Sequence, residues 1–189
     1  MKLGKLLVAR DRRAWRSWLA KNHGKAKEIW LVYYRKSSGR PRIPYNAAVE
    51  EALCFGWIDS TVKHVDRERF AQRFSPRKPK SSLSQANRER VRMLIRQKRM
   101  TAAGLSALAG VFDPKSDNPG EFKVPPEILG PLKRNRLAWR NFQRLPAEYR
   151  RIRIAYIESR KRHGPEMFRR SLEHFIKMTE RKKTFGMMK

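Results

Sequence analysis

The sequence predicts an α+β protein, with a small antiparallel sheet flanked by helices and followed by a C-terminal helical bundle. An aromatic and β-branched run at Glu28–Arg35 and a period-two alternation from Ile58 to Ser75 are typical of strands. A cluster of Pro, Gly, Asp and Asn at residues 111–124 has the composition of a linker. After it, apolar residues recur at helical spacing, which predicts the bundle.

The N-terminal α+β domain, residues 1–110, is expected to begin with a helix capped by Asp11. Glu28–Arg35 is apolar at successive positions, which favours a strand covered on both faces. Asn46 is expected to cap a short helix that Gly56 closes, because asparagine accepts the free amides at a helix start and glycine permits the turn at its end.

The alternating segment predicts an antiparallel hairpin with a polar turn at Asp66–Glu68. Ser82–Gln85 fits a capping box, in which a serine is followed three residues later by a glutamine, and it is expected to open another helix. Thr101 is expected to cap a short helix that ends near Gly110, which completes the predicted domain.

The C-terminal helical module is expected at residues 125–180, with a frayed basic tail at 181–189. Proline fits the first turn of a helix, and asparagine accepts hydrogen bonds from the free amides there. The predicted helix starts are Pro125, Asn135, Pro146 and Pro165.

Residues 45–100 carry Trp, Gly, Pro and Asn in a fixed order. The segment contains Ala-Leu-Cys54-Phe-Gly-Trp57-Ile-Asp59, then Phe-Ser-Pro-Arg77-Lys-Pro, then Ser-Gln-Ala-Asn87-Arg-Glu-Arg-Val. It resembles the signature of the bacteriocin-protection family, also described as YdeI or OmpD-associated. The resemblance covers nearly the whole chain and is looser in the C-terminal helices. At Leu83 the chain departs from relatives that carry Trp, which removes one stacking surface for a base.

The resemblance identifies relatives and implies no reaction, because the family has no established catalytic mechanism. It implies a role in tolerance of bacteriocins or antimicrobial peptides, although a chain with a net charge of +29 would repel cationic peptides.

The charge balance points to an anionic partner. The chain has 46 Lys and Arg against 17 Asp and Glu, an excess that destabilises a compact protein unless an anion or salt offsets it. Nucleic acid is the commonest such partner, with an anionic membrane or an acidic protein next. A bias of the whole proteome toward arginine is the alternative. No segment approaches the roughly 18 apolar residues of a membrane span, and Leu6–Ala9 is too short for a signal sequence, so we expect a cytoplasmic protein.

Several site types are excluded by the sequence. Cys54 is the only cysteine, so neither an intramolecular disulfide nor a cysteine-based metal cluster can form. The four histidines are dispersed, and there is no glycine-rich phosphate loop, paired-carboxylate cluster or Gly-x-Ser-x-Gly motif. Cys54 lies near the C-terminal end of its helix between Leu53 and Phe55, where an inert core thiol is expected. We therefore expect no cofactor, no metal and no catalytic residue of these types.

The strongest candidate site is the loop Ser75–Ser84 with the helix that follows it. Its cations precede a helix N-terminus, where free amides and the helix dipole attract phosphate, and two prolines stiffen it. Ser82 and Ser84 compete for the same amides, so a purely structural turn is the alternative. On the helix, arginines recur every four residues on one face, with Glu89 as the lone acid. The predicted nucleic-acid-binding residues are Arg77, Lys78, Lys80, Arg88, Arg92 and Arg96.

These observations favour a non-enzymatic, strongly basic cytoplasmic protein that binds nucleic acid or another polyanion through phosphate contacts, without reading bases. Residues 133–162, with eleven Lys or Arg against two acids, form a second basic stretch. The alternative is a small enzyme that acts on an anionic small molecule at a cleft near Trp57, Asp59 and His64. The sequence leaves open the natural ligand, the choice between DNA and RNA, and the oligomeric state.

Overall fold

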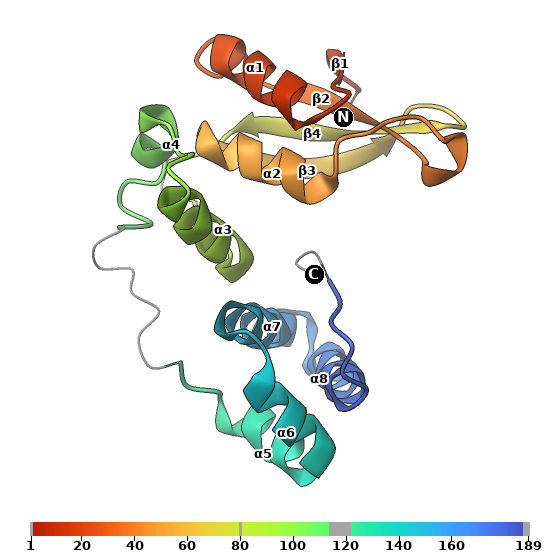
Figure 1. Cartoon of the computed structure of the whole chain (residues 1–189), viewed down its shortest axis with the longest axis vertical. Coiled ribbons are helices and arrows are strands. Elements are labelled where there is room, and N and C mark those ends of the chain that lie inside the picture. The colour runs from red at the N-terminus through yellow and green to blue at the C-terminus, as the bar shows by residue number, and fades with distance from the viewer. Residues whose placement is uncertain (1, 80, 114–121, 187–189) are drawn as a thin grey trace. The chain divides into compact units, whose positions relative to one another are not determined.

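The computed structural model describes residues 2–79, 81–113 and 122–186 (Figure 1). The chain divides into two compact units. Unit 1 comprises Met1–Leu83 and Arg90–Ser116, and unit 2 comprises Ser84–Glu89 and Asp117–Lys189. Each unit has its own hydrophobic core, and the predicted α+β class with C-terminal helices is confirmed. Most of the predicted linker at 111–124 lies outside the described residues.

Unit 1 is built on a sheet of four strands in the order β1-β2-β4-β3. The strands are β1 (Leu6–Val8), β2 (Ile29–Tyr34), β3 (Trp57–His64) and β4 (Arg69–Pro76). β4 pairs antiparallel with both β2 and β3, as expected, whereas β1 pairs parallel with β2. The sheet is therefore mixed rather than purely antiparallel, because three apolar residues near the N-terminus add an edge strand that had not been expected.

β2 is covered on both faces, as its apolar run predicted. Ile29, Leu31 and Tyr33 point into the main core of unit 1, while Trp30 and Val32 belong to a smaller cluster on the other face. This is the alternation that a strand imposes on successive side chains.

Helices α1 (Arg12–Asn22) and α2 (Tyr45–Cys54) pack into the main core, with Trp15 of α1 fully buried (Figure 1). Asp11 caps α1 as predicted, accepting a hydrogen bond of 2.8 Å from the Ala14 amide. The prediction that Asn46 caps α2 is wrong. The helix begins at Tyr45 with Pro44 in the N-cap position, two residues before Asn46, and the Asn46 side chain instead accepts a hydrogen bond of 3.0 Å from Arg90.

The hairpin of β3 and β4 turns where it was predicted, because the Asp66 carboxylate accepts the amides of Glu68 and Arg69. Helix α3 (Gln85–Arg96) follows, and the hydroxyl that accepts an amide at its start belongs to Ser84, at 3.3 Å from the Asn87 nitrogen. The predicted capping box at Ser82–Gln85 is therefore displaced by two residues.

Helix α4 (Ala102–Ser106) is capped by Thr101, as predicted, but ends before Gly110. The Thr101 hydroxyl also donates to the Cys54 carbonyl at 2.6 Å, which ties α4 to the C-terminal end of α2. Gly104 permits this close approach, since a Cβ atom there would lie 2.1 Å from the same carbonyl oxygen. A short 3₁₀ turn at Lys36–Ser38 precedes α2.

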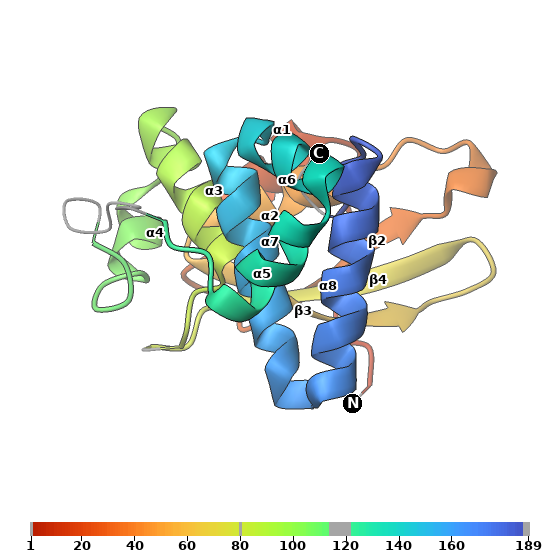
Figure 2. The ribbon, with the colours of Figure 1, turned by 90° about the horizontal axis from the view of Figure 1, so that it is seen from below.

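Unit 2 contains the helices α5 (Pro126–Arg134), α6 (Arg136–Arg144), α7 (Ala147–Ser159) and α8 (Pro165–Glu180), with a 3₁₀ turn at Arg160–His163 (Figure 2). Phe142 and Phe175 meet edge to face in its core at 6.1 Å between ring centroids. The helix starts agree with the prolines and the asparagine that marked them, and Asn135 accepts the Ala138 amide at 3.0 Å.

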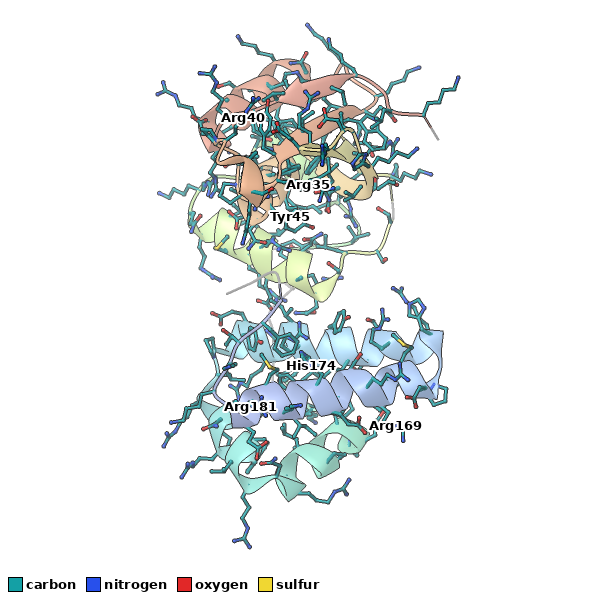
Figure 3. All side chains as sticks on the ribbon, turned by 90° about the vertical axis from the view of Figure 1, so that its right-hand side faces the viewer. Arg35, Arg40, Tyr45, Arg169, His174 and Arg181 are labelled. Atoms are coloured by element: carbon teal, nitrogen blue, oxygen red, sulfur yellow. The ribbon has the colours of Figure 1, made fainter. Side chains whose placement is uncertain are left out.

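The segment after α8 is not frayed as far as Phe185. The Tyr149 hydroxyl donates to the Phe185 carbonyl and accepts its amide, at 3.2 and 3.0 Å. The ring of His174 on α8, labelled in Figure 3, meets the Phe185 ring edge-on at 4.6 Å between ring centroids. An aromatic side chain inside a basic tail therefore fastens it to the helical core.

Candidate functional site

The loop between β4 and α3 is braced by one of its own predicted ligand-binding residues. Arg77 is only 9% exposed, and its guanidinium donates to the carbonyls of Ser81 and Ser82, the latter at 2.8 Å. The side chain therefore turns into the loop and fixes its shape. Lys78 is exposed, and Lys80 lies outside the described residues.

The arginine stripe on α3 is unevenly exposed. Arg88 and Arg92 are half-buried and already engaged in interactions within the protein, while Arg96, near the C-terminal end of the helix, is exposed. Arg90, between them, is buried, and burial lowers its pKa. Of the predicted nucleic-acid-binding residues that the structure describes, Lys78 and Arg96 are thus the exposed ones, and the binding role of the set stays a prediction.

A second group of exposed cations lies in unit 2, at the end of α5 and along α6. We call it the α6 ridge, and its members are Lys133, Arg134, Arg136, Arg140 and Arg144. All five side chains are exposed, and within the described residues no ion pair joins any of them to a carboxylate. Three of the arginines recur every four residues, which places them on one face of α6 at intervals of about 6 Å along the axis.

Three other exposed cations of unit 2 have carboxylate partners. Arg169, labelled in Figure 3, and Arg170 both pair with Glu166, at 2.5 and 2.7 Å. Lys161 pairs with Glu127. Helix α6 has no acid of its own, and within the described residues no carboxylate of another segment pairs with the α6 ridge.

The three residues of the alternative enzyme cleft do not converge. Trp57 is 1% exposed, and its indole donates to the His23 carbonyl at 3.1 Å, so it belongs to the core. His64 is exposed at the far end of β3. Asp59 is held within unit 1, where its Oδ2 accepts hydrogen bonds from the Tyr45 hydroxyl at 2.8 Å and the Gln72 amide at 2.6 Å.

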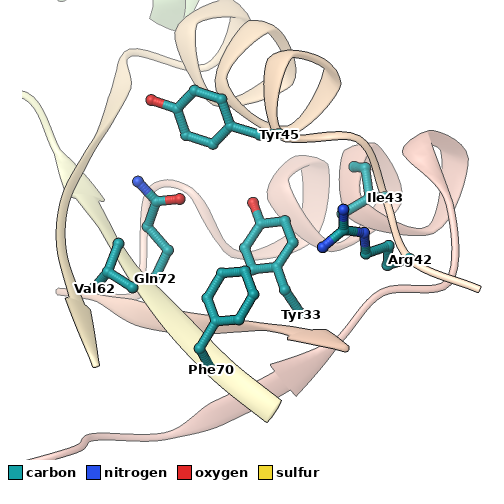
Figure 4. A pocket seen from close by; sticks show the side chains of 7 residues that line it. All are labelled: Tyr33, Arg42, Ile43, Tyr45, Val62, Phe70 and Gln72. Atoms are coloured by element: carbon teal, nitrogen blue, oxygen red, sulfur yellow. The ribbon is translucent and has the colours of Figure 1, made fainter. Parts of the chain in front are cut away.

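A cavity of about 440 Å³ lies beside Tyr45 and Gln72, the two side chains that donate to Asp59 (Figure 4). Its wall is formed by Tyr33, Arg42, Ile43, Tyr45, Val62, Phe70 and Gln72. The rings of Tyr33 and Phe70 stack at 5.2 Å. Burial, with the nearby charge of Asp59, raises the pKa of Tyr45 to about 12. This cavity could not be predicted from local patterns, because its residues come from four separate segments.

A buried carboxylate was also missed. Glu51 is fully buried on α2 and accepts hydrogen bonds from Arg12 at 2.5 Å, from Arg16 at 2.7 Å and from Arg99. Its partners lie 35 to 48 residues away along the chain, so local spacing could not reveal them. The cluster joins α1, α2 and the segment after α3.

Cys54 lies beside this cluster and is fully buried, as expected of a core thiol. Burial raises its pKa, and the negative charge of Glu51 adds to that effect. Within residues 2–79, 81–113 and 122–186 no group of three or more His, Cys, Asp or Glu side chains is arranged to hold a metal ion. In the same ranges, none of the helices combines the length and apolar character needed to cross a bilayer.

Comparison with known proteins assigns each unit to a family. Residues 7–107, a little more than half of the chain, match a domain of unknown function (DUF8412). Residues 121–182 match the family described as bacteriocin-protection, YdeI or OmpD-associated. No curated protein and no solved structure matches the chain. The expected family is confirmed, but by the C-terminal helices, whereas the 45–100 block that first indicated it falls in the other domain. The chain belongs to the family defined by the DUF8412 domain, and its C-terminal helices match the bacteriocin-protection, YdeI or OmpD-associated family.

Proposed function

We propose that the protein is a non-enzymatic binder of polyanions, that nucleic acid is its partner, and that phosphate contacts hold it without reading the bases. The observation that carries the proposal is the α6 ridge, whose five exposed cations have no carboxylate partner within the described residues. Exposed arginines that lack an internal partner keep their donors for an external phosphate.

The physical driving force is the release of counterions. A cation that neutralises a phosphate frees condensed salt ions, so binding is strong at low salt and weakens steeply as salt rises. Arg136, Arg140 and Arg144 share one face of α6 and can contact several phosphates of one strand at once. Such contacts carry no sequence information, so different sequences should bind alike.

The loop before α3 and the exposed part of the α3 stripe are proposed as an additional contact. Lys78 and Arg96 supply exposed charge there, and Arg77 contributes by holding the loop in shape. We also propose a cytoplasmic location, where nucleic acid is accessible, and cell fractionation would test it.

The test is a titration of fluorescently labelled nucleic acid at several salt concentrations. Duplex DNA, single-stranded DNA and RNA of unrelated sequences are followed by anisotropy. For the triple variant Arg136→Gln/Arg140→Gln/Arg144→Gln, the slope of log affinity against log salt on duplex DNA should flatten by about 2.7, since each lost phosphate contact removes about 0.9.

The matched control removes the same charge from α8. Arg169→Gln/Arg170→Gln/Lys177→Gln lowers the net charge equally, but two of its cations already pair with Glu166. If the control flattens the slope as much as the α6 variant, binding reflects net charge alone and the α6 ridge is no site. Absence of binding at low salt would refute the proposed function. The variant Lys78→Gln/Lys80→Gln tests the loop separately, with an expected loss of about 1.8 in slope if both lysines contact phosphate.

A further inference from the structure

The cavity of unit 1 contains a polar group for which the fold supplies no partner. Tyr33 is 2% exposed, and its hydroxyl is buried without a hydrogen bond within the described residues. Figure 4 shows this hydroxyl directed into the space between Tyr45, Gln72 and Arg42. An unsatisfied buried hydroxyl destabilises a protein, so its presence at a cavity wall points to a ligand that supplies the missing hydrogen bond.

Asp59 fixes the polarity of two neighbouring groups. The Gln72 Nε2 donates to the Asp59 carboxylate, so the Gln72 Oε1 is the atom that faces the cavity, as an acceptor (Figure 4). The Tyr45 hydroxyl donates its hydrogen to the same carboxylate, so its oxygen can only accept a further hydrogen bond. This side of the cavity therefore accepts hydrogen bonds and, being next to a carboxylate, repels anions.

The opposite side donates hydrogen bonds and is positively charged. Within the described residues Arg42 makes one hydrogen bond, from Nη1 to the Tyr34 carbonyl at 3.1 Å, which leaves its other donors for a ligand. The Tyr33 hydroxyl lies between Arg42 and Gln72 and adds a second donor. Between the two sides, the wall is apolar and includes Phe70 and Val62. The volume of about 440 Å³ is within the range of small-molecule sites.

We propose that this cavity binds a small aromatic carboxylate. Its carboxylate accepts hydrogen bonds from Tyr33 and Arg42, its ring lies against Phe70, and a donor at its far end pairs with Gln72. Asp59 acts as a positioning residue, because it sets the acceptor side and so fixes the direction of the ligand. The site lies within unit 1 and is independent of the α6 ridge, which belongs to unit 2.

The test is calorimetric titration of the full chain with 4-hydroxybenzoate, 4-aminobenzoate and benzoate, with 4-hydroxybenzamide as the uncharged counterpart. A chain of net charge +29 attracts anions in general, so inorganic phosphate is titrated in parallel. We expect saturable binding of the carboxylates with one site, tighter for those that carry a donor, and weaker binding of the amide.

Tyr33→Phe removes one oxygen atom and should weaken 4-hydroxybenzoate binding about tenfold, the effect of one hydrogen bond to a charged group. The same change should raise the melting temperature of the unliganded protein, because it removes the unsatisfied hydroxyl. Arg42→Gln alone should weaken 4-hydroxybenzoate binding more than Tyr33→Phe does, because it removes the positive charge. Arg40→Gln is the control, since Arg40 stacks on Tyr34 at 5.1 Å and does not line the cavity.

Two results would overturn the assignment. One is that none of the carboxylates binds at millimolar concentration, or that phosphate binds equally well and competes with them. The other is that Tyr33→Phe and Arg42→Gln bind as the wild type does, or that Arg40→Gln weakens binding as much as Arg42→Gln. None of these results depends on nucleic-acid binding.

Discussion

Replacing Glu51 by glutamine should be among the most destabilising single changes in unit 1. The carboxylate is fully buried and accepts hydrogen bonds from three guanidinium groups, of Arg12, Arg16 and Arg99. Glutamine keeps the shape of the side chain but loses its charge, and its amide hydrogens face donors. Three segments of unit 1 would lose the group that holds them together.

The magnitude follows from the burial of each partner. Breaking a buried ion pair costs about 3–5 kcal/mol when the remaining charge stays uncompensated. The arginine side chains are 37%, 37% and 26% exposed, so they can regain some hydration. We therefore expect about 3 kcal/mol, near the lower end of that range, and a melting temperature lowered by about 6–12 °C.

The control is Glu50→Gln on the same helix. The Glu50 side chain is 16% exposed, and it meets Arg12 at 2.6 Å and Arg99 at 4.0 Å. Because its partners remain bound to Glu51, we expect a loss of about 1 kcal/mol or less.

Urea denaturation read by tryptophan fluorescence measures the difference. Four of the five tryptophans belong to unit 1, so both variants are made in a Trp139→Phe background, where all the emission comes from that unit. The urea midpoint should fall for Glu51→Gln with an unchanged slope. Equal midpoints for the two variants would mean that Glu51 does not organise the cluster.

Three further predictions concern the same unit. Trp57→Ala should cost about 3–5 kcal/mol in the same urea assay, because a fully buried indole is removed, and a melting temperature within a degree or two of wild type would contradict this. Cys54 should react with a thiol reagent only after unfolding, and fast labelling of the native protein would disprove its burial. Because burial and Asp59 raise the pKa of Tyr45 from its usual 10 to about 12, the unfolded state loses this proton first as the pH rises. The contribution of Tyr45 to stability should therefore be complete below pH 10 and fall as the pH rises toward 12, and Asp59→Asn should move the tyrosinate absorbance change to lower pH.

Local signals in the sequence predicted local structure well. Asp11, Thr101 and Asn135 cap the helices that they were expected to cap, because a cap needs only an acceptor within three residues of a free amide. The turn at Asp66 follows the same logic. The prediction for Asn46 failed because Pro44 occupies the N-cap position of that helix. The Asn46 side chain accepts a hydrogen bond from Arg90 instead, a contact that spans 44 residues.

Features that depend on distant contacts were not predictable. β1 is a strand because β2 offers it an edge, with Leu6 opposite Trp30, and three apolar residues alone do not announce a partner. The acceptor side of the cavity depends on Asp59 meeting Gln72, thirteen residues away on another strand. The inward direction of the Arg77 side chain was not predictable for a related reason. Its guanidinium donates to the carbonyls of Ser81 and Ser82 in its own loop, and these hydrogen bonds stabilise a stiff turn.

Because cations are in excess, some arginines pair with carboxylates inside the protein and others are left without a carboxylate partner. With 17 acids against 46 Lys and Arg, some carboxylates pair with more than one arginine. Glu51 receives three arginines and Glu166 receives two. Arginines near such a carboxylate become structural, whatever their place in a basic stripe. A helix without an acid can still be paired, since Arg12 and Arg16 of α1 meet carboxylates of α2. The α6 ridge differs because, within the described residues, no other segment brings a carboxylate to it. In the proposed function, net charge is what attracts the anionic partner, and the positions of the few carboxylates decide which cations stay unpaired.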